Sequence, residues 1–305
     1  QISGRAWLAA ATAVLAIASA DPALAQSSGA NDTQADEGSD DSSTIVVIGT
    51  RRTDRSIANS ASPVDVISAV ELQQQPAANM LDVVKNLIPS FFVPQNTISD
   101  ASTFVRAPSL RGLPADNILV MLNGKRFNRS ALVQVYTGGD TALSFGSQGA
   151  DISSIPAIAV SNLQVLRDGA TAQYGSDAIG GVLNYGLRED GGIELQGLYG
   201  QNYDNGGDGE TWQVSGYGGL KLGDRGFISV AGEYYDSKGT SRGAQRPSAV
   251  NFANQFPALA NQLPNFPGPV QIWGSSPSNG WKVVVNSEFE FSSVAKVYLF
   301  GNLAH

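Results

Sequence analysis

The sequence contains no cysteine and a single histidine, His305. Without cysteine the chain has no disulfide bond, no thiolate nucleophile and no cysteine-ligated metal. One histidine leaves little room for histidine-based catalysis or zinc binding. Asp168, Ser176 and Asp177 lie in a glycine-rich stretch, where such side chains usually stabilise turns, and they have no internal histidine partner. We therefore expect no enzyme activity, no catalytic residues, no metal site and no cofactor.

Charged residues are also scarce, at 15% of the chain, and the formal net charge is −8. No run of lysine and arginine exceeds two residues, whereas a nucleic-acid binder needs a basic face. We therefore expect no nucleic-acid partner. Residues 26–43 hold five acidic residues and no basic one. Because this segment also lacks aromatic side chains, it buries too little apolar area to offset ordering, which predicts a disordered acidic linker.

The first 25 residues have the pattern of a cleaved export signal. Arg5 precedes an apolar or small-residue run from Ala6 to Ala20, and Ala23-Leu24-Ala25 is a small-x-small cleavage site. A short buried helix or a membrane anchor is the alternative. The run is shorter than the roughly 20 apolar residues that a spanning helix needs, which favours the signal peptide, residues 1–25.

Residues 53–190 alternate short strands, short helices and polar loops. Pro63 to Ile67 alternates like a strand, and Ser68 with Glu71 fits a capping box that opens a helix. Ile118 to Leu122 runs into Asn123-Gly124, the strongest short hairpin signal. A strand over 160–166 then leads to a one-turn helix closed by a glycine and to a further strand. The pattern predicts a β-rich domain with two or three short helices.

The last third of the chain changes to a two-residue period. Segments of about ten residues that are apolar on one face and polar on the other are typical of membrane-barrel strands. They cover residues 193–203, 210–222, 227–236, 281–291 and 296–304. The alternative is a soluble β-sandwich whose aromatic face forms a core.

The connections between these segments indicate their direction. Residues 223–226 and the region of Ser292-Ser293 make short turns, whereas residues 238–280 form one long connection. Outer-membrane barrels have short periplasmic turns and long external loops. If the first strand rises from the periplasm, Trp212, Tyr234 and Trp281 would lie at the outer interface on the lipid face, and Phe289 and Phe291 near the inner one.

Four spaced motifs resemble those of the TonB-dependent outer-membrane receptor family. The most informative is the stretch 162–184, which carries Leu-Arg-Asp-Gly and Tyr-Gly; the others are residues 44–48, Leu-Arg-Gly at 110–112 and Leu-Asn-Gly-Lys-Arg at 122–126. The resemblance implies an α+β plug domain at 53–190, followed at 191–305 by the first five strands of a transmembrane antiparallel β-barrel. Plugged transporters use about 22 strands, so we expect the chain to be an N-terminal fragment.

The same resemblance implies a partner and a location. Residues 44–52 are similar to the TonB box, in which an extended segment adds a strand to another protein's sheet. The TonB-binding residues would be Thr44, Ile45, Val46, Val47 and Ile48. The alternative is that they form the first strand of the next domain. The implied protein lies among outer-membrane lipids and imports a scarce ligand (siderophore, cobalamin, sugar or similar), energised by TonB and its inner-membrane complex.

The resemblance also assigns site residues. Its plug motif residues are Arg111, Gly112, Asn123, Gly124, Arg167, Tyr174 and Gly175. Family plug arginines face barrel carboxylates, which makes Arg111 and Arg167 candidates for a latch with Glu288 or Glu290, and ordinary surface ionisation the alternative. Plug loops 92–106 and 127–150 would face the ligand, through Asn128, Arg129, Tyr136 and Asp140. The rival function is a secreted or surface β-rich binding or adhesion module without transport, which would need a soluble second half.

Overall fold

The computed structural model describes residues 64–75, 79–94, 101–135, 145–167, 171–203, 208–241, 243–270 and 274–305. The chain divides into two compact units, Gln1–Ser39 and Asp40–His305, and every described residue belongs to the second. The predicted signal peptide, the acidic linker and the segment 44–52 therefore lie outside the described residues, as do Tyr136 and Asp140.

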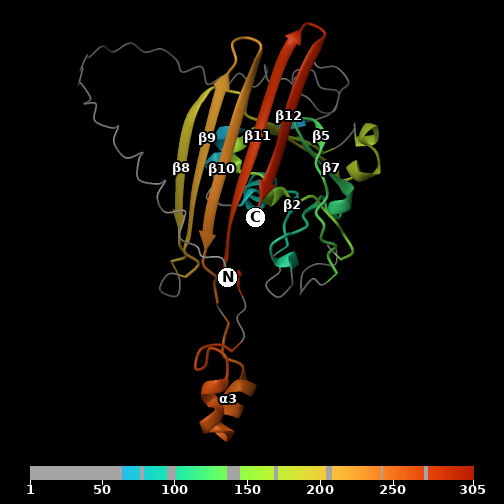
Figure 1. Cartoon of the computed structure of the whole chain (residues 1–305). Coiled ribbons are helices and arrows are strands. Elements are labelled where there is room, and N and C mark those ends of the chain that lie inside the picture. The colour runs from blue at the N-terminus through green and yellow to red at the C-terminus, as the bar shows by residue number, and fades with distance from the viewer. Residues whose placement is uncertain are drawn as a thin grey trace, which may run out of the picture. The chain divides into compact units, whose positions relative to one another are not determined.

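A five-stranded sheet, here called the small sheet, forms the centre of the N-terminal domain (Figure 1). Its order is β1-β6-β7-β4-β5, and its pairs are antiparallel except for the parallel pair β4 and β7. The strands are β1 (Val64–Ser68), β6 (Val160–Leu166), β7 (Gly181–Leu187), β4 (Ile118–Leu122) and β5 (Lys125–Arg126). The strand predicted at 160–166 is confirmed to the residue.

Two short α-helices, α1 (Ala69–Gln73) and α2 (Met80–Leu87), pack against this sheet. The predicted capping box is present: the Ser68 amide donates to Glu71 Oε2 at 2.7 Å, and the Glu71 amide donates back to Ser68 Oγ at 3.3 Å. Each bond satisfies a backbone donor at the helix start that has no partner within the helix. The apolar side of α2, which includes Leu81 and Val84, is buried.

Tight turns and single 3₁₀ turns join these elements. Asn123 (φ 49°) and Gly124 (φ 73°) form the predicted β4–β5 hairpin, in which both central residues have positive φ. A two-stranded pair, β2 (Phe91–Phe92) with β3 (Ser109–Leu110), lies beside the small sheet's helices. The 3₁₀ turns are η3 (Ala101–Thr103), η4 (Ala115–Asn117), η5 (Ile152–Ser154), η6 (Ala157–Ala159), η7 (Thr171–Tyr174) and η8 (Ser176–Ala178).

A second sheet, here called the long sheet, contains five consecutive antiparallel strands that run side by side (Figure 1). They are β8 (Gly192–Gly200), β9 (Thr211–Lys221), β10 (Gly226–Ser237), β11 (Ser278–Ser292) and β12 (Ala295–Ala304). All five predicted segments are therefore strands. Short turns at 222–225 and 293–294 join one end, whereas the connection 238–277 carries α3 (Pro247–Gln255) and η10 (Pro257–Gln262) at the other.

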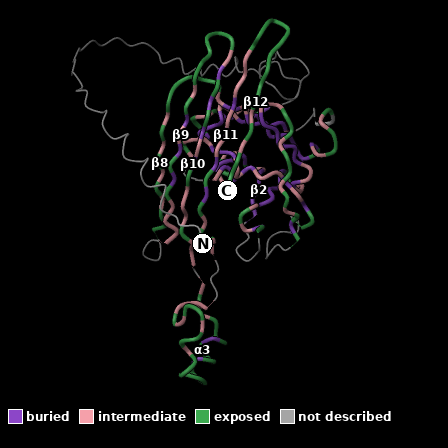
Figure 2. Tube along the Cα trace, in the orientation of Figure 1, coloured by how far each residue is buried: buried purple, intermediate pink, exposed green. Residues whose placement is uncertain are grey.

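Residues of the long sheet range from buried to exposed (Figure 2). The buried face carries mainly polar side chains together with a few apolar ones, and the exposed face is apolar. The buried face includes Gln213, Ser215, Ser229, Glu233, Lys282 and Asn286, and the exposed face includes Ile193, Leu195, Val214, Leu220, Val230 and Phe291. A soluble sandwich has the reverse arrangement, so the structure contradicts that alternative for the described residues.

Aromatic side chains gather at one end of the exposed face. Tyr234 is the register partner of Trp281, and Tyr199 that of Trp212. The Trp212 and Tyr234 rings lie 5.2 Å apart, whereas Phe289 and Phe291 contact each other toward the opposite end. Two groups of aromatic residues therefore lie toward opposite ends of the long sheet, and their position at membrane interfaces stays a prediction. Within the described residues, no α-helix has the length and hydropathy to cross a lipid bilayer.

One hydrophobic core joins the N-terminal domain to the long sheet. It is built from the small sheet, the α2 stripe and the 3₁₀ turns, and Tyr217, Ala231 and Val284 of the long sheet belong to it. This shared core explains why residues 40–305 form one compact unit. The domain boundary predicted at 190/191 falls in the link between β7 and β8.

Candidate functional site

Arg188 occupies the link between the small sheet and the long sheet. Its guanidinium binds Asp190 through two bonds, of 2.9 and 2.6 Å, and Glu194 at 2.5 Å. Its Cζ atom lies 3.8 Å from the centre of the Tyr217 ring. The Arg188 side chain is 15% exposed, although its two carboxylate partners are largely open to solvent. This single arginine therefore ties the link to both β8 and β9.

The backbone at Arg188 is held equally closely by the long sheet. Its carbonyl accepts hydrogen bonds from Ser229 Oγ at 3.0 Å and Asn286 Nδ2 at 3.2 Å. The Tyr217 hydroxyl donates to the Asp190 carbonyl at 2.7 Å. The hydrogen bonds from Arg188 also hold the pKa of the Asp190 carboxyl below its usual value. Side chains of the long sheet therefore hold the backbone of the link in place at Arg188 and Asp190.

A third contact at the junction comes from the predicted motif residue Asn123. Its Nδ2 donates to Asn286 Oδ1 at 3.1 Å, and its Oδ1 accepts from the Leu187 amide at 2.8 Å. Its positive φ aims the side chain away from the hairpin toward β11 and the end of β7. Farther along, Asn302 Nδ2 donates to Ser154 Oγ at 3.1 Å. Neutral amides and hydroxyls therefore supply several of the side-chain bonds that join the N-terminal domain to the long sheet among the described residues.

The expected pairing of Arg111 or Arg167 with Glu288 or Glu290 is not formed among the described residues. Arg111 donates to the Arg167 carbonyl, and the Arg167 guanidinium pairs with Asp65 at 2.5 Å. Glu288 pairs with Lys296 of the neighbouring strand at 3.0 Å, and Glu290 is exposed. Arg167 and Glu288 therefore each pair with a charge other than the proposed one.

The remaining motif residues shape turns of the N-terminal domain. Arg111 (φ 55°) and Gly112 (φ 77°) turn the chain after β3, and Gly175 (φ 90°) separates η7 from η8. Tyr174 packs on the smaller core cluster around Leu166 and Val182. These positions are structural in the described chain.

Asn128 and Arg129, expected to face the ligand, lie on the surface. The Arg129 guanidinium pairs with Asp116 and Asp177, each at 3.3 Å, and Arg126 also binds Asp177. The hydrogen bond from Arg126 lowers the pKa of the Asp177 carboxyl. This ion network belongs to the N-terminal domain, and neither Asn128 nor Arg129 lines the cavity described next.

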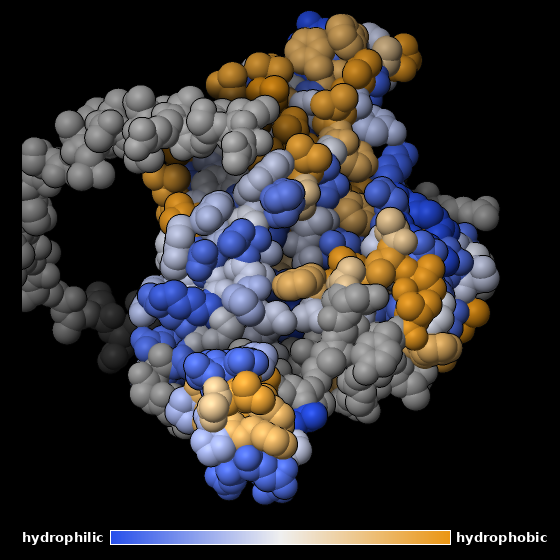
Figure 3. Space-filling view, turned by 60° about the horizontal axis from the view of Figure 1, so that its bottom comes forward, coloured by the Kyte–Doolittle hydropathy of each residue, from blue (hydrophilic) through white to orange (hydrophobic). Residues whose placement is uncertain are grey.

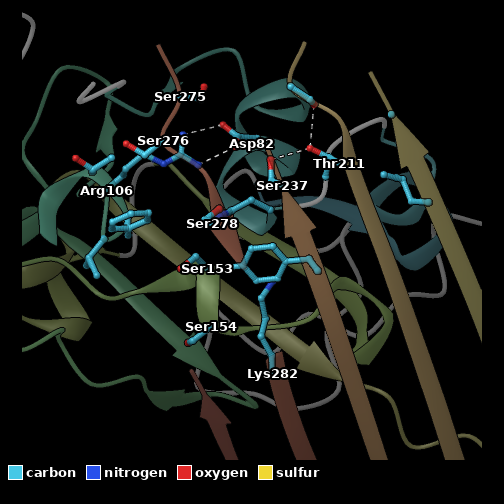
Figure 4. A pocket seen from close by; sticks show the side chains of 18 of the residues that line it. Asp82, Arg106, Ser153, Ser154, Thr211, Ser237, Ser275, Ser276, Ser278 and Lys282 are labelled. Atoms are coloured by element: carbon cyan, nitrogen blue, oxygen red, sulfur yellow. Dashed lines mark hydrogen bonds and ion pairs between the residues drawn. The ribbon is translucent and has the colours of Figure 1, made fainter. Parts of the chain in front are cut away.

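A cavity of about 840 Å³ lies between the N-terminal domain and the buried face of the long sheet (Figure 4). Thr103, Phe104, Val105 and Arg106 line it, so the predicted loop 92–106 contributes to its wall. Its opposite wall is formed by the ends of the long strands that lead into the loops 201–210 and 238–277. No sequence pattern pointed to Ser153 and Ser154, which η5 brings to the same cavity.

Each wall of the cavity is held by contacts of its own. The Arg106 guanidinium binds both oxygens of Asp82, at 3.1 and 2.7 Å, and thereby ties the 101–106 segment to α2. The hydroxyls of Thr211 and Ser237 bond each other at 2.7 Å across β9 and β10. Figure 3, which turns the α3 end forward, shows mainly hydrophilic surface in the middle of this face. Among the described residues, no group of three or more histidine, aspartate or glutamate side chains is placed to hold a metal ion.

Comparison with known proteins identifies the N-terminal domain. The family model of the TonB-dependent Receptor Plug Domain matches residues 56–182. Residues 56–182 are a TonB-dependent receptor plug domain. The plug therefore includes the small sheet, its helices and the Asn123 turn, and the long sheet takes the place of receptor barrel strands. Its five strands do not close on one another; β8 and β12 are its edges.

Relatives agree with this assignment over part of their length. The vitamin B12 transporter BtuB of Photobacterium profundum is 31% identical over 150 residues, which is 49% of this chain and 21% of BtuB. Two solved structures share the fold. The Pseudomonas aeruginosa ferric enterobactin receptor PfeA (mutant Q482A, in complex with enterobactin) has a TM-score of 0.56 and 16% identity, and covers 79% of this chain and 32% of PfeA.

The second is the siderophore receptor PirA from Acinetobacter baumannii, with a TM-score of 0.54 and 18% identity over 81% of this chain and 32% of PirA. The chain thus spans about a fifth of the curated relative and about a third of the two solved receptors. At these identities the structures support the fold, a plug domain joined to antiparallel barrel strands, and not a particular ligand.

Proposed function

We propose that this chain belongs to an outer-membrane receptor that imports a scarce ligand with energy delivered through TonB. One observation carries the proposal: the plug domain packs on the polar face of a sheet whose other face is apolar and exposed. A strand with lipid on one side and protein on the other has this pattern. The family is one of receptors and transporters rather than enzymes.

The lengths of the connections at the two ends of the long sheet indicate which end would face the periplasm. Short turns at 222–225 and 293–294 would face the periplasm, and the connections 201–210 and 238–277 would face outward. The 840 Å³ cavity lies at the outward end, where a ligand would first meet the plug. Ligand binding there would release the N-terminal segment on the periplasmic side.

The coupling strand of the proposal is the segment from Thr44 to Ile48. It would add to the sheet edge of TonB by main-chain hydrogen bonds, so side-chain identity would matter less than each backbone N–H. The predicted export signal at 1–25 and the predicted acidic linker at 26–43 would place this strand in the periplasm. The relatives' names give two examples of such ligands: BtuB is a vitamin B12 transporter and PfeA is a ferric enterobactin receptor.

A proline at position 47 tests the coupling strand. Val47→Pro removes one backbone donor and fixes φ, so we expect loss of ligand uptake with ligand binding at the cell surface unchanged. Purified Val47→Pro receptor should also fail to bind the periplasmic domain of TonB in calorimetry. Val47→Ala keeps the donor and serves as the matched control. Normal transport by the proline variant would refute the assignment of residues 44–48.

Membrane fractionation separates this function from the adhesion module. A plug-barrel receptor is extracted with detergent from the outer-membrane fraction, whereas a secreted adhesion module stays in buffer. The apolar exposed face of the long sheet favours the first result. Recovery of the full-length protein in buffer, folded and monodisperse, would favour the adhesion module instead.

A further inference from the structure

The cavity between the plug and the long sheet has a lining that selects a chemical class of ligand. We propose that the imported ligand is uncharged and carries many hydroxyl or amide groups, as a neutral oligosaccharide or a cobalamin does. This inference rests on the proposed function, since it takes the cavity at the outward end to be the place where ligand meets the plug.

Uncharged hydrogen-bonding groups make up almost half of the lining. Among its 25 residues are six serines, two threonines, three asparagines and one glutamine. They come from both walls, with Ser153 and Ser154 on the plug side and Ser276 and Ser278 on the long-sheet side (Figure 4). Hydroxyls and amides both donate and accept, and so suit a ligand that does both.

The positive charges at the cavity are already neutralised. Arg106 holds Asp82 through two bonds, and Lys282 pairs with Glu233, with side chains 6% and 1% exposed respectively. Separating the second pair would leave a buried charge without a partner, which is strongly unfavourable. Neither cation is therefore available to an incoming anion.

The carboxylates and the lysine and arginine side chains of the lining are equal in number. Asp151 also lines the cavity, where its carboxylate accepts from the Ser153 amide at 3.1 Å. With Asp82 it makes two carboxylates against Arg106 and Lys282. A negatively charged ferric siderophore would therefore meet no excess of positive charge, and no unpaired lysine or arginine, among the described lining residues.

Two aromatic side chains complete the lining. Phe104, which is 52% exposed, comes from the plug, and Tyr235 comes from β10. Each offers an apolar ring face beside hydrogen-bonding groups, the combination that typical small-molecule sites use to bury a ligand and fix its orientation. Sugar rings and the corrin ring both have one apolar face and a polar edge.

Binding to the purified full-length receptor tests the ligand class. Calorimetry would use three probes: maltoheptaose and cyanocobalamin, which are uncharged overall, and ferric enterobactin, which is an anion. We expect one of the neutral probes to bind, with a Kd that changes less than about threefold between low and high salt, because screening acts only on charges. The two neutral arms distinguish a sugar from a cobalamin.

Variants that introduce a negative or a positive charge at Ser276 test whether the ligand is charged. For an uncharged ligand, Ser276→Asp and Ser276→Lys should change the Kd in the same direction; for an anion they should act in opposite directions. Ser276→Trp fills the cavity and should weaken binding about tenfold or more. Ser292→Trp, at the opposite end of β11, is the matched control and should leave the Kd unchanged.

Ferric enterobactin binding that tightens in Ser276→Lys, or the absence of binding by both neutral probes, would overturn the inference. The same preparation distinguishes failure of the ligand class from failure of the proposed transport function. If it fractionates with the outer membrane and binds the periplasmic domain of TonB, the transport proposal stands and only the ligand class is lost.

Discussion

Arg188 shows how a single residue joins the plug to the wall. Its guanidinium holds Asp190 and Glu194, its plane covers Tyr217, and its carbonyl accepts from Ser229 and Asn286. Nothing in the local sequence marks this residue, because Arg-Glu-Asp after a strand is a common surface pattern. Its partners come from β8, β9, β10 and β11, so only the packed sheets reveal it.

Replacing Arg188 with alanine should weaken the junction. Arg188→Ala leaves two carboxylates without their partner and uncovers the Tyr217 ring; because those carboxylates are partly open to solvent, we expect a loss of about 2 kcal/mol. Thermal unfolding of the full-length receptor in detergent and limited proteolysis of the plug would measure it. Arg126→Ala is the control: Arg126 is 54% exposed and pairs with Asp177 within the plug. An equal loss in both variants would contradict the special role of Arg188.

At the scale of single elements the sequence was a good guide. The capping box at Ser68, the Asn123-Gly124 hairpin and all five long strands follow from local patterns, and each is present. The reason is that caps, tight turns and two-residue periodicity depend on neighbours a few residues away. The connection 238–280 was expected only as a loop, yet it contains α3 and η10.

The exposed face of the long strands supports a prediction about depth in the membrane. Val230 lies on this face within β10, 45% exposed, whereas Leu222 lies at the short turn after β9. A lysine on the lipid face costs about 2–4 kcal/mol near the bilayer midplane and about 0–1 near the interface. Val230→Lys should therefore reduce the stability of the full-length receptor refolded into lipid vesicles far more than Leu222→Lys. Equal effects would argue against lipid contact.

At the scale of the whole molecule, the plug is attached through different residues from those expected. Arg167 and Glu288 satisfy their charges locally, with Asp65 and Lys296. Besides the contacts of Arg188, the bonds that cross from plug to wall among the described residues include Asn123 to Asn286 and Asn302 to Ser154. A surface ion pair contributes little when each charge has a nearer partner, and a neutral amide pair lets the two parts separate without exposing a buried charge.

A double-mutant cycle distinguishes attachment of the plug through Asn123 and Asn286 from attachment through Arg167 and Glu288. Asn123→Ala, Asn286→Ala and the double variant should show a coupling of about 0.5–1.5 kcal/mol in plug retention, the net worth of one hydrogen bond. The matched cycle on Arg167 and Glu288 should show none. Plug retention is measured as the denaturant concentration at which the plug of the full-length receptor becomes cleavable by protease. Coupling in the second cycle and not in the first would restore the arginine latch.

Local sequence was enough to establish the strands, the helix cap, the hairpin and the alternation that makes one face of each long strand apolar, because these features depend on near neighbours. It also carried the motifs by which the plug domain was identified. Only the packed molecule shows which charges pair, which residues hold plug to wall and which line the cavity. Those outcomes depend on side chains that are far apart in the chain, such as Arg167 with Asp65 and Lys282 with Glu233, which only folding brings together.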